Sequence, residues 1–260
     1  ESKALKDTQE VVFAQTPLDI AKAIRKNVFN KLPTCIVSSA TLTVQNSFKP
    51  FCTQVGIQEN QDHVLVKQFD SPFAYDKKAL FIGLKDMPQS ESTLLSRDQI
   101  EAIFQLSLTI HGGVFILFTS YAALEHAYTQ LHESLTKKNL LSLKQGEMPR
   151  SQLIEEFKKS SKAILFGTDS FWEGVDVPGK ALRMVIITKL PFQVPSDPLA
   201  IARSEYLKKK GQNPFAHYFL PKAVVKFKQG FGRLIRTKEE FGAIVCLDNR
   251  IYEKSYGKLF

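Results

Sequence analysis

The fold is decided by residues 113–138, which read "GVFILFTSYAALEHAYTQLHESLTKK". The stretch opens with an apolar run of strand length, and the rest repeats its apolar residues at the three- and four-residue spacing of an amphipathic helix. The opening run is apolar throughout instead of alternating, which is typical of a parallel strand covered by helices on both faces. The stretch therefore predicts a strand followed by a helix in an α/β protein.

The same alternation continues on either side. Helical patterns cover residues 97–112 and 151–160 and the chain after Pro198. Between about residues 43 and 96 the pattern weakens, which we interpret as a connecting or edge segment. This order of elements predicts an α/β fold with a mostly parallel sheet flanked by helices on both faces. The further strand-like runs are "TCIVSSAT" (34–41), "LLSLKQ" (140–145), "AILFGT" (163–168), "LRMVIITKLPF" (182–192) and "GAIVCLD" (242–248).

Composition narrows the class of protein. The 260 residues are 43% hydrophobic, enough for a buried core, and a formal charge of +9 favours polyanionic partners, with nucleic acid first among them. No apolar run approaches the roughly 20 residues that span a bilayer, and the opening residues lack the pattern of a signal peptide. We therefore expect a cytoplasmic protein with no membrane partner. Because the chain starts at Glu1, we also expect it to be a piece of a longer protein.

The three cysteines, Cys35, Cys52 and Cys246, are scattered and odd in number. This usage argues against a disulfide framework or a structural zinc ion. We expect all three to be buried as small apolar side chains, and we expect no metal site in this chain.

Hydroxyl side chains follow three of the strand-like runs. In open α/β sheets the ligand crevice lies at the carboxyl ends of the strands, where hydroxyls near helix N-termini make good phosphate contacts. Any one of these clusters is more often a helix cap or a turn. Together they indicate a row of sites for a phosphate backbone, read without base specificity. The clusters are Ser38–Thr41, Thr119 with Ser120, and Thr168 with Ser170.

The stretch "QGFGRLIR" (229–236) places two arginines among two glycines in what reads as a helix. Glycine costs roughly 1 kcal/mol relative to alanine in a helix interior, so the pattern points to a functional site. A solvated basic face is the alternative, but close approach of a phosphate group explains the glycines better, because arginine's planar fork matches phosphate oxygens. Counting helical turns gives an apolar face of Val224, Phe227, Phe231, Leu234 and Ile235, and a polar face of Lys222, Lys226, Gln229, Arg233 and Arg236.

Two other stretches imitate nucleotide sites. Residues 174–181, "GVDVPGKA", fit the spacing of a triphosphate-binding loop. However, Ala181 stands where a magnesium-binding hydroxyl is required, and Pro178 removes a backbone N–H from the cradle. Asp248 ends an apolar strand like a magnesium-binding aspartate, but we interpret it as a capping residue of a core strand.

Five stretches together carry a family resemblance. They resemble, in order, the motifs of the second motor domain of superfamily 2 helicases of the DinG/XPD type, and the resemblance spans roughly residues 34 to 250. Its most specific parts are the third and the last. The stretches are "SSATL" (38–42), "GGVFILFTSY" (112–121), "FGTDSFWEGVDVPG" (166–179), "KLPFQVPSDP" (189–198) and "QGFGRLIR" (229–236).

The resemblance implies an architecture and a set of partners. Residues 34–260 would be a second RecA-like domain, and residues 1–33 a junction or linker helix from the preceding region. ATP and Mg²⁺ would be held mainly by a first RecA-like domain of the same polypeptide, which is absent from this chain. An iron–sulfur cluster, found in most members, would also lie outside this chain. The implied partner is single-stranded DNA, in a repair or replication role.

The resemblance also implies roles for individual residues. Arg233 and Arg236 would be arginine fingers that reach the γ-phosphate, with Gln229 beside them. Ser39 and Thr41 would couple the nucleotide state to nucleic-acid contact. The nucleotide side of the cleft would be lined by Glu173, Gly174 and Asp176, and DNA phosphates would be held by Thr119, Ser120, Thr168 and Ser170.

Two alternatives stay open. The first is a nucleic-acid-binding module from a degenerate helicase attached to a nuclease, and the fingers argue against it. The second is a free-standing NTPase that uses residues 174–181, which Ala181 and Pro178 disfavour.

Overall fold

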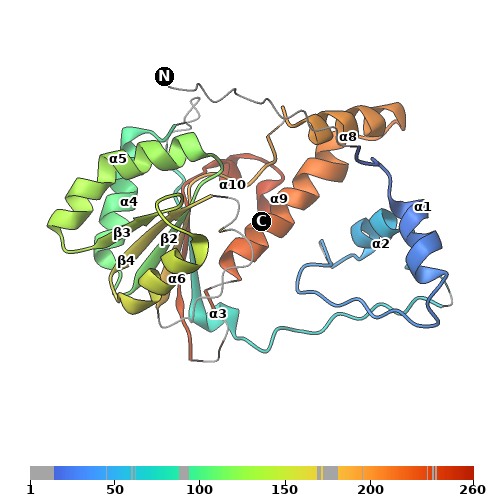
Figure 1. The fold of residues 1–260 in the computed structure, drawn as a ribbon, viewed down its shortest axis with the longest axis horizontal. Helices are drawn as coiled ribbons and strands as arrows, with labels where there is room; N and C mark the ends of the chain where they lie inside the picture. Colours follow the sequence, from blue (N-terminus) through green and yellow to red (C-terminus); the bar gives the residue numbers. More distant parts are fainter. Residues whose placement is uncertain are drawn as a thin grey trace, which may run out of the picture.

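The computed structural model describes residues 15–44, 46–59, 61, 63–87, 94–168, 171, 181–194, 196–232, 234–235, 237 and 239–260. At its centre is a six-stranded sheet in the order β1-β6-β5-β2-β4-β3, and every neighbouring pair is parallel (Figure 1). The predicted α/β fold with a parallel sheet is confirmed. The strands are β1 (Ala79–Gly83), β2 (Gly113–Leu117), β3 (Leu141–Lys144), β4 (Ala163–Gly167), β5 (Leu182–Ile187) and β6 (Gly242–Cys246).

Successive side chains of one strand enter two different cores, which explains the continuous apolar runs. In β2, Phe115 packs in the core beneath α6 (Arg150–Lys159) and α9 (Leu220–Phe231). Its neighbour Ile116 packs in the core beneath α4 (Arg97–Thr109) and α5 (Tyr121–Lys137). Every residue of β2 and β4 is buried because helices cover both faces of the sheet.

Helix α4 begins with a capping box in which the side chains of Ser96 and Gln99 each accept a hydrogen bond from the other residue's backbone N–H. The remaining helical elements are short or lie outside these two layers. The other elements are α1 (Ala21–Ile24), η1 (Arg25–Phe29), α2 (Lys49–Val55), α3 (Tyr75–Lys78), α8 (Pro198–Lys209), η2 (Phe215–Phe219), α10 (Arg250–Glu253) and η3 (Gly257–Leu259).

The structure differs from the sequence prediction at residues 34–41, which form no strand. Residues 31–40 are all exposed, and Ile36 is 89% exposed. A strand needs a neighbour for its backbone N–H and C=O groups, and the described part of the chain supplies none here. The first strand of the sheet is instead β1. It lies inside the weakly patterned residues 43–96, at one edge of the sheet.

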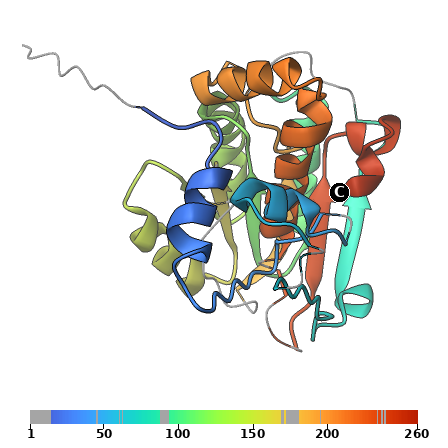
Figure 2. The same ribbon diagram turned by 90° about the vertical axis from the view of Figure 1, so that its right-hand side faces the viewer.

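We call the described residues between 15 and 74 the N-terminal region. Figure 1 shows its helices α1 and α2 on the side of α9 that faces away from the sheet, below α8, and Figure 2 shows the same region from the right-hand side of that view. The two helices pack so closely that a Cβ on Gly56 would clash with the carbonyl oxygen of Ala21. Gly56 ends α2 at φ +80°. The region is tied to α8 by Asp19, which accepts a hydrogen bond from the Tyr206 hydroxyl at 2.8 Å. The predicted division of the chain at residue 33 stays a prediction.

Candidate functional site

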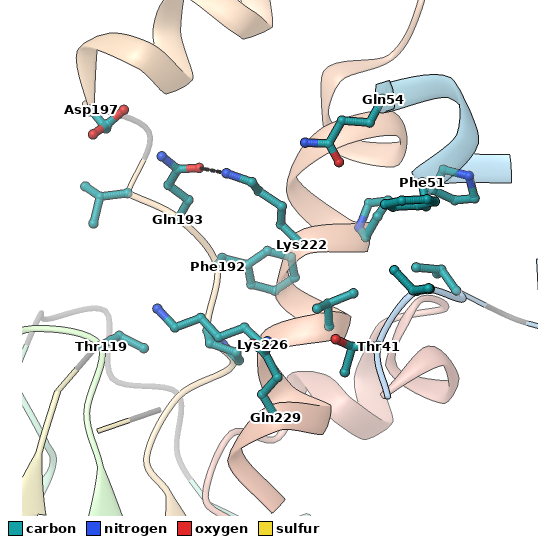
Figure 3. A pocket seen from close by; sticks show the side chains of 17 residues that line it. Thr41, Phe51, Gln54, Thr119, Phe192, Gln193, Asp197, Lys222, Lys226 and Gln229 are labelled. Carbon is teal, nitrogen blue, oxygen red and sulfur yellow. Dashed lines mark hydrogen bonds between the residues drawn. The ribbon is translucent and has the colours of Figure 1, made fainter. Parts of the chain in front are cut away.

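A pocket of about 600 Å³ lies between the N-terminal region, the segment that follows β5, and helix α9 (Figure 3). Apolar side chains such as Phe51 and Val225 form part of its wall. The polar residues that line it are Thr41, Gln54, Thr119, Gln193, Asp197, Lys222, Lys226 and Gln229.

Helix α9 supplies most of the polar wall, and its sequence explains why. Val224 and Phe227 are buried, whereas Lys222, Lys226 and Gln229 line the pocket on the opposite side of the helix. This part of the predicted amphipathic pattern is therefore confirmed.

The helix ends earlier than the pattern predicted. It ends at Phe231, and Gly232 is its C-cap, so "RLIR" follows the helix instead of continuing it. Leu234 and Ile235 are nevertheless buried, each 1% exposed. Gly232 consequently breaks no helix-interior rule, because glycine is well tolerated where a helix ends.

Gln229 carries an unsatisfied polar atom. Its Oε1 is buried, and no hydrogen-bond partner is found for it within the described residues. A buried acceptor without a partner costs roughly 1–3 kcal/mol, so natural proteins rarely retain one without a reason. The side chain lies at the pocket wall close to Lys226 (Figure 3), where a bound ligand could donate to it.

The pocket brings together three of the residues singled out from the sequence. Gln229, expected beside the fingers, lines the same space as Thr119, expected at DNA, and Thr41, expected to couple the two. Thr119 comes two residues after the end of β2, whereas Thr41 belongs to the N-terminal region. Next to Thr41, the Ser39 hydroxyl accepts a hydrogen bond from the Thr41 backbone N–H at 3.2 Å.

The electrostatic character of the pocket favours an anion. Two basic side chains, Lys222 and Lys226, line the pocket. Among the described lining residues Asp197 is the only acidic one. Asp197 is already engaged, because its Oδ1 accepts the backbone N–H of Ala200 at 2.8 Å and caps α8. The Lys222 ammonium lies 3.1 Å from the Tyr218 hydroxyl and 3.4 Å from Gln193 Oε1.

Two of the strand-end hydroxyls are used by the fold itself. Ser120 caps α5 by accepting the backbone N–H of Ala123 at 3.2 Å, as the cap alternative predicted. Thr168 is 4% exposed, and both its backbone N–H and its hydroxyl donate to Gln145 Oε1, at 2.7 and 3.1 Å. Neither residue lines the pocket.

Gln145 was missed in the sequence. It ends the strand-like run 140–145, and its side-chain amide also contacts the Tyr121 hydroxyl. It thereby joins the ends of β3 and β4 to the start of α5. A long polar side chain directly after an apolar strand, at the edge where hydroxyls were already noted, was the signal that could have identified it.

Several predicted site residues lie outside the described residues, and their roles stay predictions. They are Ser170, Glu173, Gly174, Asp176, Arg233 and Arg236.

The cysteines correct one expectation. Cys52 and Cys246 are buried as predicted, but Cys35 is exposed, because the strand expected around it does not form. Burial raises the pKa of the Cys246 thiol to about 12. The described residues contain no group of three or more His, Cys, Asp or Glu side chains placed to hold a metal ion. Within the same residues, no helix has the length and apolarity needed to cross a bilayer.

Known proteins share this sequence pattern. Residues 103–260 match the family model described as the helicase C-terminal domain. The chain belongs to that family. It is 36% identical over 97% of its length to the "ATP-dependent DNA helicase YoaA" of Escherichia coli K12, and 35% identical over 96% to the "3'-5' exonuclease DinG" of Bacillus subtilis 168. The resemblance to the DinG/XPD type is thus confirmed. This helicase C-terminal domain spans only 39% and 27% of those two relatives.

Solved structures agree on the fold. The helicase C-terminal domain superposes on "XPD_Helicase" with a TM-score of 0.68, over 93% of this chain and 43% of that one, at 16% identity. It also superposes on "S. cerevisiae Dbp5 bound to RNA and ADP BeF3" with a TM-score of 0.54, over 92% and 52% of the chains, at 16% identity. The predicted RecA-like fold is confirmed.

Proposed function

We propose that this chain is the carboxyl-terminal motor domain of an ATP-dependent DNA helicase. In this proposal it supplies arginine fingers to ATP held by a first motor domain and contacts the backbone of single-stranded DNA. The observation that carries the proposal is the shared pocket of Thr41, Thr119 and Gln229. The similarity to relatives such as the ATP-dependent DNA helicase YoaA supports an ATP-dependent DNA helicase activity of the longer protein.

The pocket suits a phosphate-bearing ligand. Lys222 and Lys226 provide positive charge, and Thr41 and Thr119 provide hydroxyl donors, which are groups that commonly contact phosphates. Backbone contacts of this kind give sequence-indifferent binding that weakens as salt is added. Ser120, Thr168 and Ser170 stay proposed DNA contacts on the family resemblance alone, because Ser120 and Thr168 lie outside the pocket lining and are hydrogen-bonded within the fold.

The fingers follow directly after α9. Arg233 and Arg236 come within a few residues of Gln229, whose buried Oε1 has no partner among the described residues. A finger supplied by a second domain stabilises transition-state charge and makes hydrolysis depend on domain closure. In this proposal Glu173, Gly174 and Asp176 line the nucleotide side, and Ser39 and Thr41 couple the two ligands.

The proposal also states which part of the longer protein holds each cofactor. Gln229 is the described residue that fits a nucleotide, through its free acceptor, whereas no described cluster fits Mg²⁺. We therefore assign ATP and Mg²⁺ mainly to the first motor domain. We assign any iron–sulfur cluster to another part of the longer protein, and we place that protein in the cytoplasm.

The exposed segment 34–41 supports the presence of a partner domain. It is strand-like in sequence, and Ile36 is 89% and Val37 47% exposed. Because the chain spans only 39% of the YoaA relative, most of such a protein lies outside it. We propose that the first motor domain covers this segment.

The decisive experiment measures ATP turnover of the longer protein with single-stranded DNA. Arg233→Ala or Arg236→Ala should reduce turnover on the order of a thousandfold. Lysine at either position should rescue little, because lysine lacks the planar fork. Lys228→Ala, on the same helix but outside the pocket lining, is the matched control. Equal turnover in the arginine and Lys228 variants would contradict the finger assignment.

Binding by the 260-residue chain alone is a separate test. It should bind oligo(dT) weakly, with affinity that falls steeply as salt increases. It should neither hydrolyse ATP nor bind it tightly. Micromolar ATP binding in calorimetry would instead revive the free-standing NTPase.

Cysteine labelling tests the partner domain. The exposed Cys35 thiol should react readily with a maleimide in this chain and slowly in the longer protein, whereas the buried Cys246 should be protected in both. Equal Cys35 labelling in the two proteins would contradict the proposed contact.

A second candidate function has its own support. The Bacillus subtilis relative is named a 3'–5' exonuclease, which favours a nucleic-acid-binding module attached to a nuclease. In that case the longer protein would bind single strands, and the arginine variants would leave its activity unchanged.

A further inference from the structure

Asp248 is a buried carboxylate that the proposed function does not use. It comes two residues after the end of β6 and is 6% exposed. Burying an ionised carboxylate is costly unless it is paired and hydrogen-bonded. Its partners therefore show what the residue holds in place.

The first partner is Arg250, two residues further along the chain. Asp248 Oδ1 accepts hydrogen bonds from the Arg250 backbone N–H at 3.1 Å and from its Nε at 2.9 Å. The Arg250 side chain is only 31% exposed. The two charges thus compensate one another at the carboxyl edge of the sheet, and hydrogen bonding to Asp248 raises the pKa of the Arg250 guanidinium.

The second partner lies in the segment that follows β5. Asp248 Oδ2 accepts the backbone N–H of Leu190, 58 residues earlier in the chain, at 2.8 Å. Leu190 is 2% exposed and begins the segment 190–194, which continues as Pro191, Phe192, Gln193 and Val194. The carboxylate therefore fixes the start of a segment that has already left β5.

Arg250 fixes the same segment at a second point. Its guanidinium lies 5.5 Å from the centre of the Phe192 ring, a favourable cation–π distance. The Phe192 ring also packs on Phe215 and Tyr256, with centroids 5.6 and 5.7 Å away. In addition, the Phe192 backbone N–H donates to the Leu190 carbonyl at 2.8 Å.

The segment held in this way is one wall of the pocket. Pro191, Phe192, Gln193 and Val194 all line it. Gln193 Oε1 accepts the Tyr218 hydroxyl at 3.0 Å and approaches the Lys222 ammonium at 3.4 Å, the contact drawn in Figure 3. The wall consequently determines where a cation of α9 lies.

We propose that Asp248 and Arg250 are a positioning pair that fixes segment 190–194 and, through Gln193, places Lys222 at the pocket. Neither residue of the pair lines the pocket, so neither contacts the ligand there. The inference deepens the proposed function and rests on it only for the identity of the ligand, a phosphate backbone.

The position of the wall is tested by hydrogen exchange on the 260-residue chain. Asp248→Asn keeps one carbonyl acceptor for Leu190 but loses the charge that pairs with Arg250. Because the charge-assisted pairing with Arg250 is lost and a neutral amide oxygen accepts more weakly from Leu190, the amides of Leu190, Phe192, Gln193 and Val194 should exchange about tenfold faster. The amides of β2 and β4 should keep their wild-type protection. Unchanged exchange in residues 190–194 would overturn the proposal.

The consequence for the pocket is tested with oligo(dT) at low salt. Asp248→Asn should weaken binding about three- to tenfold, the usual range for a residue that acts through another. Arg250→Lys keeps the charge but loses the fork, so its effect should be smaller. If Asp248→Asn folds poorly, the affinity of the Arg250→Lys variant for oligo(dT) still tests the proposal. Faster exchange with wild-type affinity would overturn the claim that the wall matters for binding.

A matched control is available one turn away. Glu253 is exposed and accepts the Asn249 side-chain amide at 2.9 Å on the same turn. Glu253→Gln should therefore change neither exchange nor affinity, and an equal effect in this variant would overturn the assignment to the pair. If the unaltered chain fails to bind oligo(dT), the proposed function fails, while the exchange experiment still decides the position of the wall.

Discussion

Two short segments of this chain have the same composition and opposite environments. Residues 35–37 read "CIV", and residues 244–246 read "IVC". Ile244 is 5% exposed in β6, between β1 and β5, whereas Ile36 is 89% exposed. The comparison teaches that strand propensity is a preference for a pleated, half-buried surface, and that a strand forms only where neighbours provide that surface.

The sharpest way to break this comparison is to truncate the two isoleucines. Ile244→Ala should lower the free energy of unfolding by about 2–5 kcal/mol, because it leaves a cavity in a closed core. Ile36→Ala should change it by no more than about 0.5 kcal/mol, because the side chain is already in water. Urea denaturation of both variants measures the difference. A large loss in the Ile36 variant would mean that residues 34–41 are buried in this chain.

The cysteines sharpen the comparison through pH. The Cys246 pKa is raised to about 12 by burial, from an ordinary value of 9.0. Between these values the unfolded chain loses a proton that the folded chain keeps, so stability falls as pH rises. This group alone should lower the free energy of unfolding by about 1 kcal/mol from pH 8 to pH 10.

The same denaturation series in two variants isolates that contribution. Cys246→Ala should flatten the decline between pH 8 and pH 10, and Cys35→Ala should leave it unchanged because Cys35 is exposed. A decline that Cys246→Ala does not alter would show that the thiol is not shielded.

The smallest expected effect concerns how the N-terminal region is attached. Asp19 accepts from Tyr206 and lies 3.8 Å from the Lys210 ammonium, and these contacts lower its pKa, the Tyr206 hydrogen bond most of all. The attachment is therefore present above about pH 4 and weakens as the carboxylate is protonated. Asp19→Asn should change global stability by at most about 0.5 kcal/mol, because exposed pairs contribute little.

Local release should be easier to detect than the change in stability. Limited proteolysis should cut residues 15–30 faster in the Asp19 variant and leave the sheet intact. Loss of the whole domain to protease would mean that the region and the sheet fold as one unit.

The sequence predicted the buried sheet well, for a physical reason. Runs such as residues 113–117 and 163–167 are apolar on both faces, and only a sheet covered on both sides accommodates them. The strand β1 was harder to identify, because at the sheet edge Leu80 and Phe81 stay 60% and 45% exposed. The run 34–41 was predicted as a strand because its residues have a high strand propensity. The sequence pattern does not show whether a neighbouring strand is available to pair with it.

The candidate site was predicted less completely. Thr41, Thr119 and Gln229 were each identified as polar residues beside apolar elements, but their sequence separation hides the shared pocket. Gln145 and Asp248 act through hydrogen bonds to distant backbone N–H groups, at Thr168 and Leu190. No local pattern encodes such a partner, so only the folded chain identifies it.

The strand order also imposes a delay between the synthesis of β1 and the synthesis of the strand that pairs with it. Among the described residues β1 pairs with β6 alone, which begins at Gly242, although β1 has already ended at Gly83. At a ribosomal rate of roughly 5–20 residues per second, β1 waits on the order of ten to thirty seconds for its partner. During that interval its exposed edge and the apolar side chains of the nascent chain are open to chaperones.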